Sequence, residues 1–115
     1  MAHLSEHPAL PELQRYMDEV CQERGWNKDD YAQKFLLFTE EVGELAKAIR
    51  NAAGLYDEQA KQQKQEGQQE RRRANLEEEF ADVLSYLLDL ANYFHVDLEQ
   101  AFREKERVNK TRRWE

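Results

Sequence analysis

Residues 35–49 read FLLFTEEVGELAKAI, a segment in which apolar side chains recur at every third or fourth position. This spacing predicts an amphipathic helix with one inward-facing stripe. The stripe consists of Phe38, Val42, Leu45 and Ile49. The flanking residues suggest its bounds, because Asn27 can cap a helix that begins near Lys28 and Gly54 can end it.

The same spacing predicts three more helices elsewhere in the chain. They run from about Pro8 or Pro11 to Arg24, from about Asn75 to Phe94, and from Asp97 as the cap to about Arg112. No stretch alternates like a strand, so we expect an all-α, four-helix bundle that forms one domain over residues 1–115. Only 40% of the 115 residues are hydrophobic, and we expect oligomerisation to complete so thin a core.

Residues 55–75 lack an apolar period and are rich in Gln, with three consecutive arginines at 71–73. This composition predicts a solvated polar connection that is either part-helical or disordered. The arginines could bind phosphate, but a solvated run of charge is the more common reading.

Charge and composition exclude several classes of protein. The net charge is -7, which disfavours binding to duplex nucleic acid. The single cysteine, Cys21, excludes an internal disulfide and a cysteine-based zinc site. We see no secretory signal and no run of apolar residues long enough to span a membrane, so we expect a cytoplasmic protein.

Four acidic residues lie on the flanks of the two longest predicted apolar stripes, where core residues belong. They are Glu41 and Glu44 on one helix and Glu79 and Asp82 on the other. Unpaired burial of an ionised carboxylate costs several kcal/mol, and no Lys or Arg lies between Ala74 and Asp97. A bound Mg²⁺ or Mn²⁺ would compensate this charge. The alternative is that these acids are simply solvated.

In the last predicted helix, the residues on one face change from apolar to polar and basic along the helix. Its stripe begins with Leu98 and Phe102 and continues, at the same period, as Lys105, Asn109 and Arg112. Lys and Arg suit phosphate oxygens, and an amide can orient a sugar or a base. Trp114 could stack on a base. The alternative is a fraying basic terminus.

Two acidic motifs, FTEEVGEL at 38–45 and EEFADV at 78–83, together resemble the signatures of the MazG-like all-α nucleotide pyrophosphohydrolases. The C-terminal Lys105, Asn109, Arg112 and Trp114 look like the substrate-side tail of that family. The resemblance implies hydrolysis of a nucleoside triphosphate to the monophosphate and pyrophosphate. It leaves the base, the sugar and the number of metal ions open.

The resemblance also implies roles for individual residues. Mg²⁺ would be held by Glu41, Glu44, Glu79 and Asp82, and Glu40 or Glu41 would activate the attacking water. The family is commonly dimeric or tetrameric, so a homodimer or homotetramer is expected. The connection between Glu44 and Glu79 is longer than in compact members. Two other functions remain open: a non-catalytic helical interaction module, and a sensor that binds a nucleotide without hydrolysing it.

Overall fold

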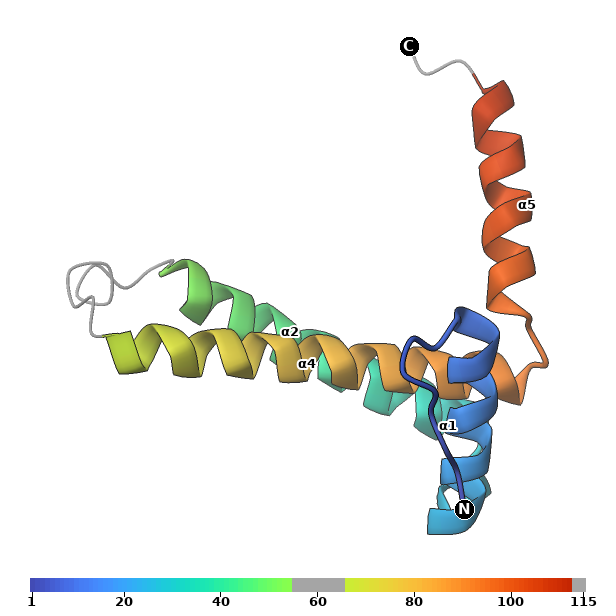
Figure 1. Ribbon diagram of the computed structural model, residues 1–115, viewed down its shortest axis with the longest axis horizontal. Helices are drawn as coiled ribbons and strands as arrows, with labels where there is room; N and C mark the ends of the chain where they lie inside the picture. The colour runs from blue at the N-terminus through green and yellow to red at the C-terminus, as the bar shows by residue number, and fades with distance from the viewer. Residues whose placement is uncertain (55–65, 113–115) are drawn as a thin grey trace. The chain divides into compact units, whose positions relative to one another are not determined.

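The computed structural model describes residues 1–54 and 66–112, and this part of the chain is all-α (Figure 1). It contains four α-helices, one 3₁₀ turn and no strand, which confirms the predicted fold class. The elements are α1 (Leu10–Arg24), η1 (Trp26–Lys28), α2 (Tyr31–Ala53), α4 (Glu66–Tyr93) and α5 (Leu98–Thr111). Most of the predicted polar connection, residues 55–65, lies outside the described residues.

The end of α1 and the start of α2 are set by one glycine and the short turn that follows it. Gly25 adopts a left-handed conformation with φ of 72° and donates its N–H to the carbonyls of Cys21 and Gln22, as a helix-ending glycine does. The predicted start of α2 near Lys28 is wrong. Residues 26–28 form the 3₁₀ turn, and Asp29 is extended at ψ of 142°, so α2 begins only at Tyr31.

The predicted start of α4 near Asn75 is also wrong, because this helix begins at Glu66. Residues 66–75 lack an apolar stripe, but Gln, Glu, Arg and Ala all have high helix propensity. Side-chain contacts one turn apart support the segment. Arg73 Nε lies 3.1 Å from Glu77 Oε1, and Arg71 Nε donates to the Gly67 carbonyl at 3.2 Å. Helix propensity therefore extends α4 into a region without an apolar period.

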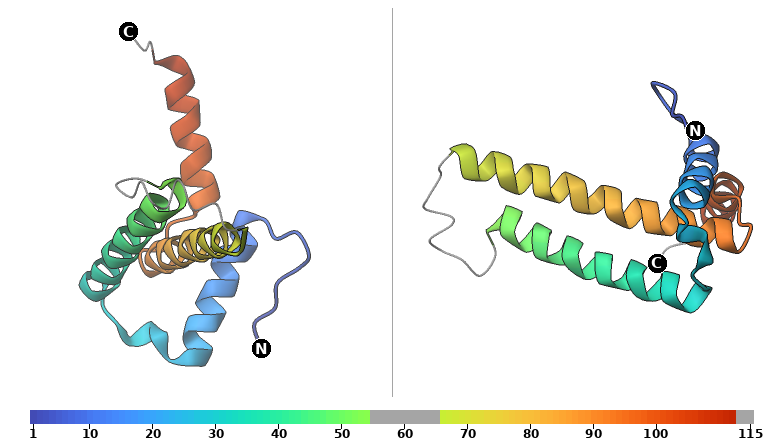
Figure 2. Two further views of the ribbon diagram at one scale, coloured as in Figure 1. Left: turned by 90° about the vertical axis from the view of Figure 1, so that its left-hand side faces the viewer. Right: turned by 90° about the horizontal axis from the view of Figure 1, so that it is seen from below.

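The chain divides into two compact units. One comprises Met1–Tyr31 with Leu88–Glu115, and the other comprises Ala32–Leu87. In the second unit α2 and α4 run side by side in opposite directions (Figures 1 and 2). Among the described helices, none has the length and apolar character needed to cross a bilayer.

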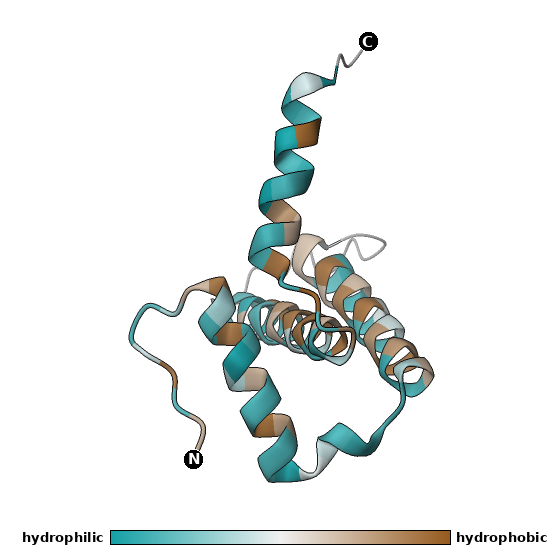
Figure 3. Cartoon of the chain, turned by 90° about the vertical axis from the view of Figure 1, so that its right-hand side faces the viewer, coloured by the Kyte–Doolittle hydropathy of each residue, from teal (hydrophilic) through white to brown (hydrophobic). Residues whose placement is uncertain are grey.

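Many large apolar side chains on α2 and α4 stay uncovered in the single chain. Of the predicted stripe on α2, Phe38 and Leu45 are half-buried, but Val42 and Ile49 are 42% and 43% exposed. On α4, Phe80 is 54% exposed. Figure 3 shows the apolar bands along these helices. Burying such side chains is worth roughly 1.5–3 kcal/mol each, so these faces leave apolar burial incomplete.

The turn between α4 and α5 has the hydrogen bonds of a Schellman motif, with histidine in the position usually occupied by glycine. The Val96 N–H donates to the Ala91 carbonyl at 2.8 Å, and the His95 N–H donates to the Asn92 carbonyl at 3.1 Å. His95 is exposed and has a φ of 56°. After the turn, the Asp97 carboxylate accepts from the Gln100 N–H at 3.1 Å, which confirms the predicted cap of α5.

We predict that His95→Gly stabilises the protein, because the left-handed conformation costs a residue with a Cβ about 1 kcal/mol. The free energy of unfolding should rise by about 0.5–1 kcal/mol in urea titrations. Gly25→Ala is the mirrored control, since it adds a Cβ at a φ of 72° and should lower stability by a similar amount. A loss of stability in His95→Gly would contradict this account.

Candidate metal centre

Three carboxylates converge within the unit formed by residues 32–87. Glu41 comes from α2, and Glu79 and Asp82 come from α4. Each offers an oxygen atom, and these atoms all lie within 4.8 Å of one another. Residues three apart share a helix face, which places Glu79 and Asp82 together. The antiparallel pairing of α2 with α4 brings Glu41 to the same place.

All three side chains are half-buried, and one of their oxygens lacks a partner. Glu79 Oε2 is buried and makes no hydrogen bond among the described residues. A buried acceptor without a partner costs about 1–3 kcal/mol, and more when it is charged. This orphaned oxygen indicates that the cluster is incomplete without a further positive or hydrogen-bonding group.

The electrostatics of Glu41 reflect the same deficit of positive charge. Burial raises the pKa of its carboxyl above the ordinary value, and the negative charges of Asp82 and Glu79 raise it further. A hydrogen bond with Glu79 and the charge of Glu40 act in the same direction. Without a cation, the cluster therefore retains a proton on Glu41 more readily than a free carboxylate would.

The donor set fits a hard divalent cation. Carboxylate oxygens are the ligands that Mg²⁺ and Mn²⁺ prefer. Magnesium binds oxygen at about 2.1 Å, so opposite ligands lie about 4.2 Å apart. At most one pair among three ligands can be opposite, and adjacent ligands lie about 3.0 Å apart, so the three oxygens, which lie within 4.8 Å of one another, would move closer together to bind one ion. Glu79 Oε2 has no hydrogen-bond partner among the described residues, so this oxygen is available as a metal ligand.

The other two acids of the first predicted motif are not part of this three-residue cluster. Glu40 and Glu44 are both exposed on α2. Glu44 follows Glu41 by almost one helical turn, and Glu40 directly precedes Glu41. Glu40 is nevertheless close enough for its charge to raise the pKa of Glu41. The structure therefore brings together three of the four acids predicted to bind metal.

The predicted substrate-side residues belong to the other compact unit. On α5, Lys105 is exposed and Asn109 is half-buried, and Asn109 Oδ1 is buried without a hydrogen-bond partner among the described residues. Arg112 is the exposed residue that ends α5. Trp114 lies outside the described residues.

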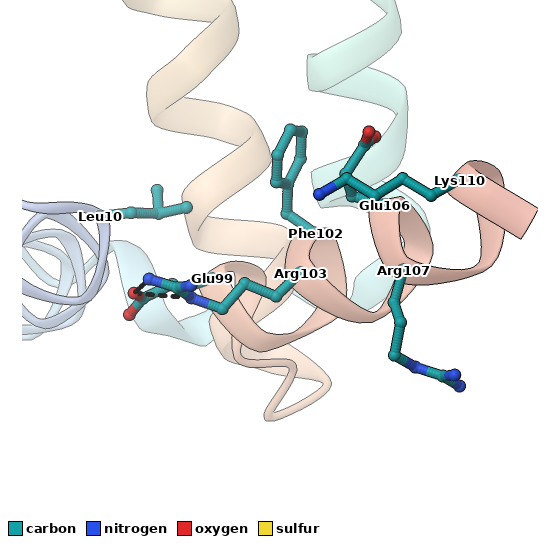
Figure 4. A pocket seen from close by; sticks show the side chains of 7 residues that line it. All are labelled: Leu10, Glu99, Phe102, Arg103, Glu106, Arg107 and Lys110. Atoms are coloured by element: carbon teal, nitrogen blue, oxygen red, sulfur yellow. Dashed lines mark hydrogen bonds and ion pairs between the residues drawn. The ribbon is translucent and has the colours of Figure 1, made fainter.

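The two apolar residues at the start of α5, Leu98 and Phe102, are more exposed than the predicted packing of this face requires. Leu98 is half-buried, but Phe102 is 71% exposed, so the expected packing of this face is not made by the single chain. Phe102 instead lines an open hollow of about 480 Å³, together with Leu10, Glu106 and Lys110. Figure 4 shows Arg103 at the edge of this hollow, paired with Glu99 at 3.1 Å.

Sequence reasoning missed two buried polar residues, Gln14 on α1 and Lys34 on α2. They are 9% and 4% exposed. Lys34 precedes Glu41 by seven residues, a spacing that returns to the same helix face. This relation was visible in the sequence. Gln14 carried no such signal, since its partners are about eighty residues away.

Comparison with known proteins gives consistent matches. Residues 32–113 match the MazG nucleotide pyrophosphohydrolase domain. The chain is 37% identical over 112 residues to dCTP pyrophosphatase 1 of Mus musculus and 36% identical over 110 residues to dCTP pyrophosphatase 1 of Homo sapiens. Each match covers 94% of this chain, which spans 61% of the length of either relative.

The raised pKa of Glu41 predicts a pH-dependent stability in the absence of divalent cations. A carboxyl with a raised folded-state pKa contributes stability below its unfolded pKa, and that contribution is lost as the pH rises through the folded pKa. Glu41→Gln should therefore match the parent protein near pH 4 and melt a few degrees higher at pH 7 in EDTA.

The matched control is Glu78→Gln, which neutralises an exposed acid on α4. It should leave the melting temperature unchanged at both pH values. A Glu41→Gln protein that melts below the parent at pH 7 in EDTA would contradict the inferred repulsion.

Proposed function

Since the chain belongs to the MazG nucleotide pyrophosphohydrolase family, we propose that it hydrolyses a nucleoside triphosphate to the monophosphate and pyrophosphate. The observation that carries this proposal is the cluster of Glu41, Glu79 and Asp82 with its orphaned buried oxygen. These three residues would hold Mg²⁺, or Mn²⁺ in its place. Glu44 would join them as a further ligand through a change of side-chain conformation.

The chemistry needs a charged polyphosphate to be neutralised and a water to be activated. A divalent cation held by Glu41, Glu79 and Asp82 would supply both, since it would offset the phosphate charge and lower the pKa of the attacking water. Water attacks a phosphorus, and the bridging bond to the departing pyrophosphate breaks. The proton of the attacking water passes to a nearby carboxylate. Glu40 is the candidate base because it lies beside Glu41 and stays outside the three-residue cluster; Glu41 is the alternative.

The substrate side of the proposal rests on α5 and the residues after it. Lys105 and Arg112 would contact phosphate oxygens. Asn109 Oδ1, which is buried without a partner, is an acceptor for a sugar hydroxyl or a base amino group. Trp114 would stack on the base. The relatives are named dCTP pyrophosphatases, so dCTP is the first substrate to test.

Association of this chain with further copies of itself is part of the same proposal. Phe35, Val42 and Phe80 are between 42% and 59% exposed, which is unusual for large apolar residues on two neighbouring helices. A homodimer or homotetramer would cover them. Sedimentation analysis should give two or four times the 13.8 kDa of one chain, and the mass of a single chain would contradict this part of the proposal.

We predict that the protein releases pyrophosphate from at least one member of a panel of ribo- and deoxyribonucleoside triphosphates in the presence of Mg²⁺. Glu79→Gln should lower kcat/KM by about 100-fold or more, because it removes a charged ligand from the cluster. Glu78→Gln is the matched control and should keep the parent activity, since its side chain is exposed on the same helix.

The alternatives give different outcomes in the same experiment. A nucleotide sensor would bind triphosphates and release no pyrophosphate. A non-catalytic interaction module would neither bind them nor gain thermal stability from Mg²⁺. The proposed enzyme should gain stability from Mg²⁺ as the parent protein and lose that gain as Glu79→Gln. A full panel without pyrophosphate release would overturn the proposal.

A further inference from the structure

Gln14 is a buried polar side chain in the second turn of α1. It is 9% exposed, whereas Gln22 of the same helix is exposed and its Nε2 donates to Asp18 Oδ2 at 3.2 Å. The partners of Gln14 are not on α1. They lie at the end of α4 and the start of α5.

The side-chain amide of Gln14 spans the turn that joins these two helices. Its Nε2 donates to the Val96 carbonyl at 2.8 Å, and its Oε1 accepts from the Leu98 N–H at 2.9 Å. Those two backbone groups flank Asp97, the cap of α5. One side chain therefore holds the backbone on both sides of the cap.

A second pair of contacts ties the same residue to α4. Gln14 Nε2 lies 3.3 Å from Asn92 Oδ1, and Asn92 Nδ2 donates to the Gln14 carbonyl at 2.8 Å. We name Gln14, Asn92 and the backbone of 96–98 the amide latch. The latch fastens α1 to the last turn of α4 and to the first turn of α5.

The latch binds two backbone groups that the Schellman hydrogen bonds and the Asp97 cap leave unused, the Val96 carbonyl and the Leu98 N–H. The Leu98 N–H lies in the first turn of α5, where backbone N–H groups have no partner within the helix. Asp97 satisfies only the Gln100 N–H in that turn, at 3.1 Å. Gln14 supplies the acceptor for Leu98, and it does so from a different helix. The direction in which α5 leaves the turn thus depends on α1.

We propose that Gln14 is a positioning residue, whose amide latch sets the orientation of α5 and hence of Lys105, Asn109 and Arg112. This inference rests on the proposed function, in which those residues contact the substrate. Gln14 itself touches no reacting group. It acts on substrate binding through the helix that it holds.

The test uses Gln14→Met, which keeps the length and the helix propensity of the side chain and removes its hydrogen bonds. The variant should raise KM for the nucleotide about 10-fold and leave kcat within about 2-fold of the parent, since uniform substrate binding is what is lost. Amide hydrogen exchange at Leu98, followed by NMR, should become at least about 10-fold faster.

Gln22→Met is the matched control, because it makes the same substitution at an exposed position of α1. It should change neither KM nor the exchange at Leu98. Asn92→Ala removes the other side chain of the latch and should raise KM in the same direction. Combining it with Gln14→Met should raise KM by less than the product of the two single changes, since both act on one network.

Each other outcome has a definite meaning. Faster exchange at Leu98 with unchanged KM would overturn the positioning role and leave a structural one. Unchanged exchange at Leu98 would overturn the latch itself. If Gln14→Met does not fold, Gln14→Glu keeps the acceptor for Leu98 and loses the donor to Val96. This variant should raise KM while exchange at Leu98 stays near the parent rate, and an unchanged KM would overturn the positioning role. A parent protein without hydrolysis would overturn the proposed function, and exchange at Leu98 would still test the latch.

Discussion

Repulsion among three carboxylates, with no basic residue on α4 beyond Arg73 to relieve it, governs the chemistry of this chain. Glu41, Glu79 and Asp82 lie together on the facing sides of α2 and α4, and no Lys or Arg occurs between Ala74 and Asp97. Two helices that pack through such a cluster lose stability unless a proton or a cation is bound. Burial and the charges of Asp82 and Glu79 raise the pKa of Glu41, so its carboxyl holds a proton more readily. A bound divalent cation would relieve the same repulsion. The repulsion within the cluster supports the proposal that these carboxylates bind a divalent cation.

The apolar faces show how little of the core one chain provides. The fully buried hydrophobic residues are small or medium in size, and among the described residues no large side chain is completely buried. Among the described residues of the unit 32–87, Ala48 is the one hydrophobic residue that is buried. Side chains such as Phe80 and Leu87 have apolar surface that remains in contact with water. Covering it by self-association would at the same time hold α2 and α4 together around their acidic cluster.

The sequence was most informative where a local rule decides the outcome. Gly25 and Gly54 end helices because a left-handed residue is needed there, and Asp97 caps α5 through its own side chain. The periodicity of α2 and α4 placed Glu41, Glu79 and Asp82 on matching flanks. Helix starts were less predictable. Helix propensity alone carries α4 back to Glu66, and a 3₁₀ turn delays α2, because neither depends on an apolar stripe.

Long-range polar contacts could not be predicted, and the amide latch shows why. Gln14 and Leu98 are separated by 84 residues, and no periodicity connects a buried glutamine to a backbone N–H on another helix. The sequence does predict that hydrogen-bond acceptors are needed at this turn, because the first N–H groups of every helix lack partners within the helix. Asp97 satisfies one such group locally, and Gln14 satisfies another from a distance. Asp97 acts within its own helix, whereas the hydrogen bonds of Gln14 join α1 to the backbone on both sides of the turn.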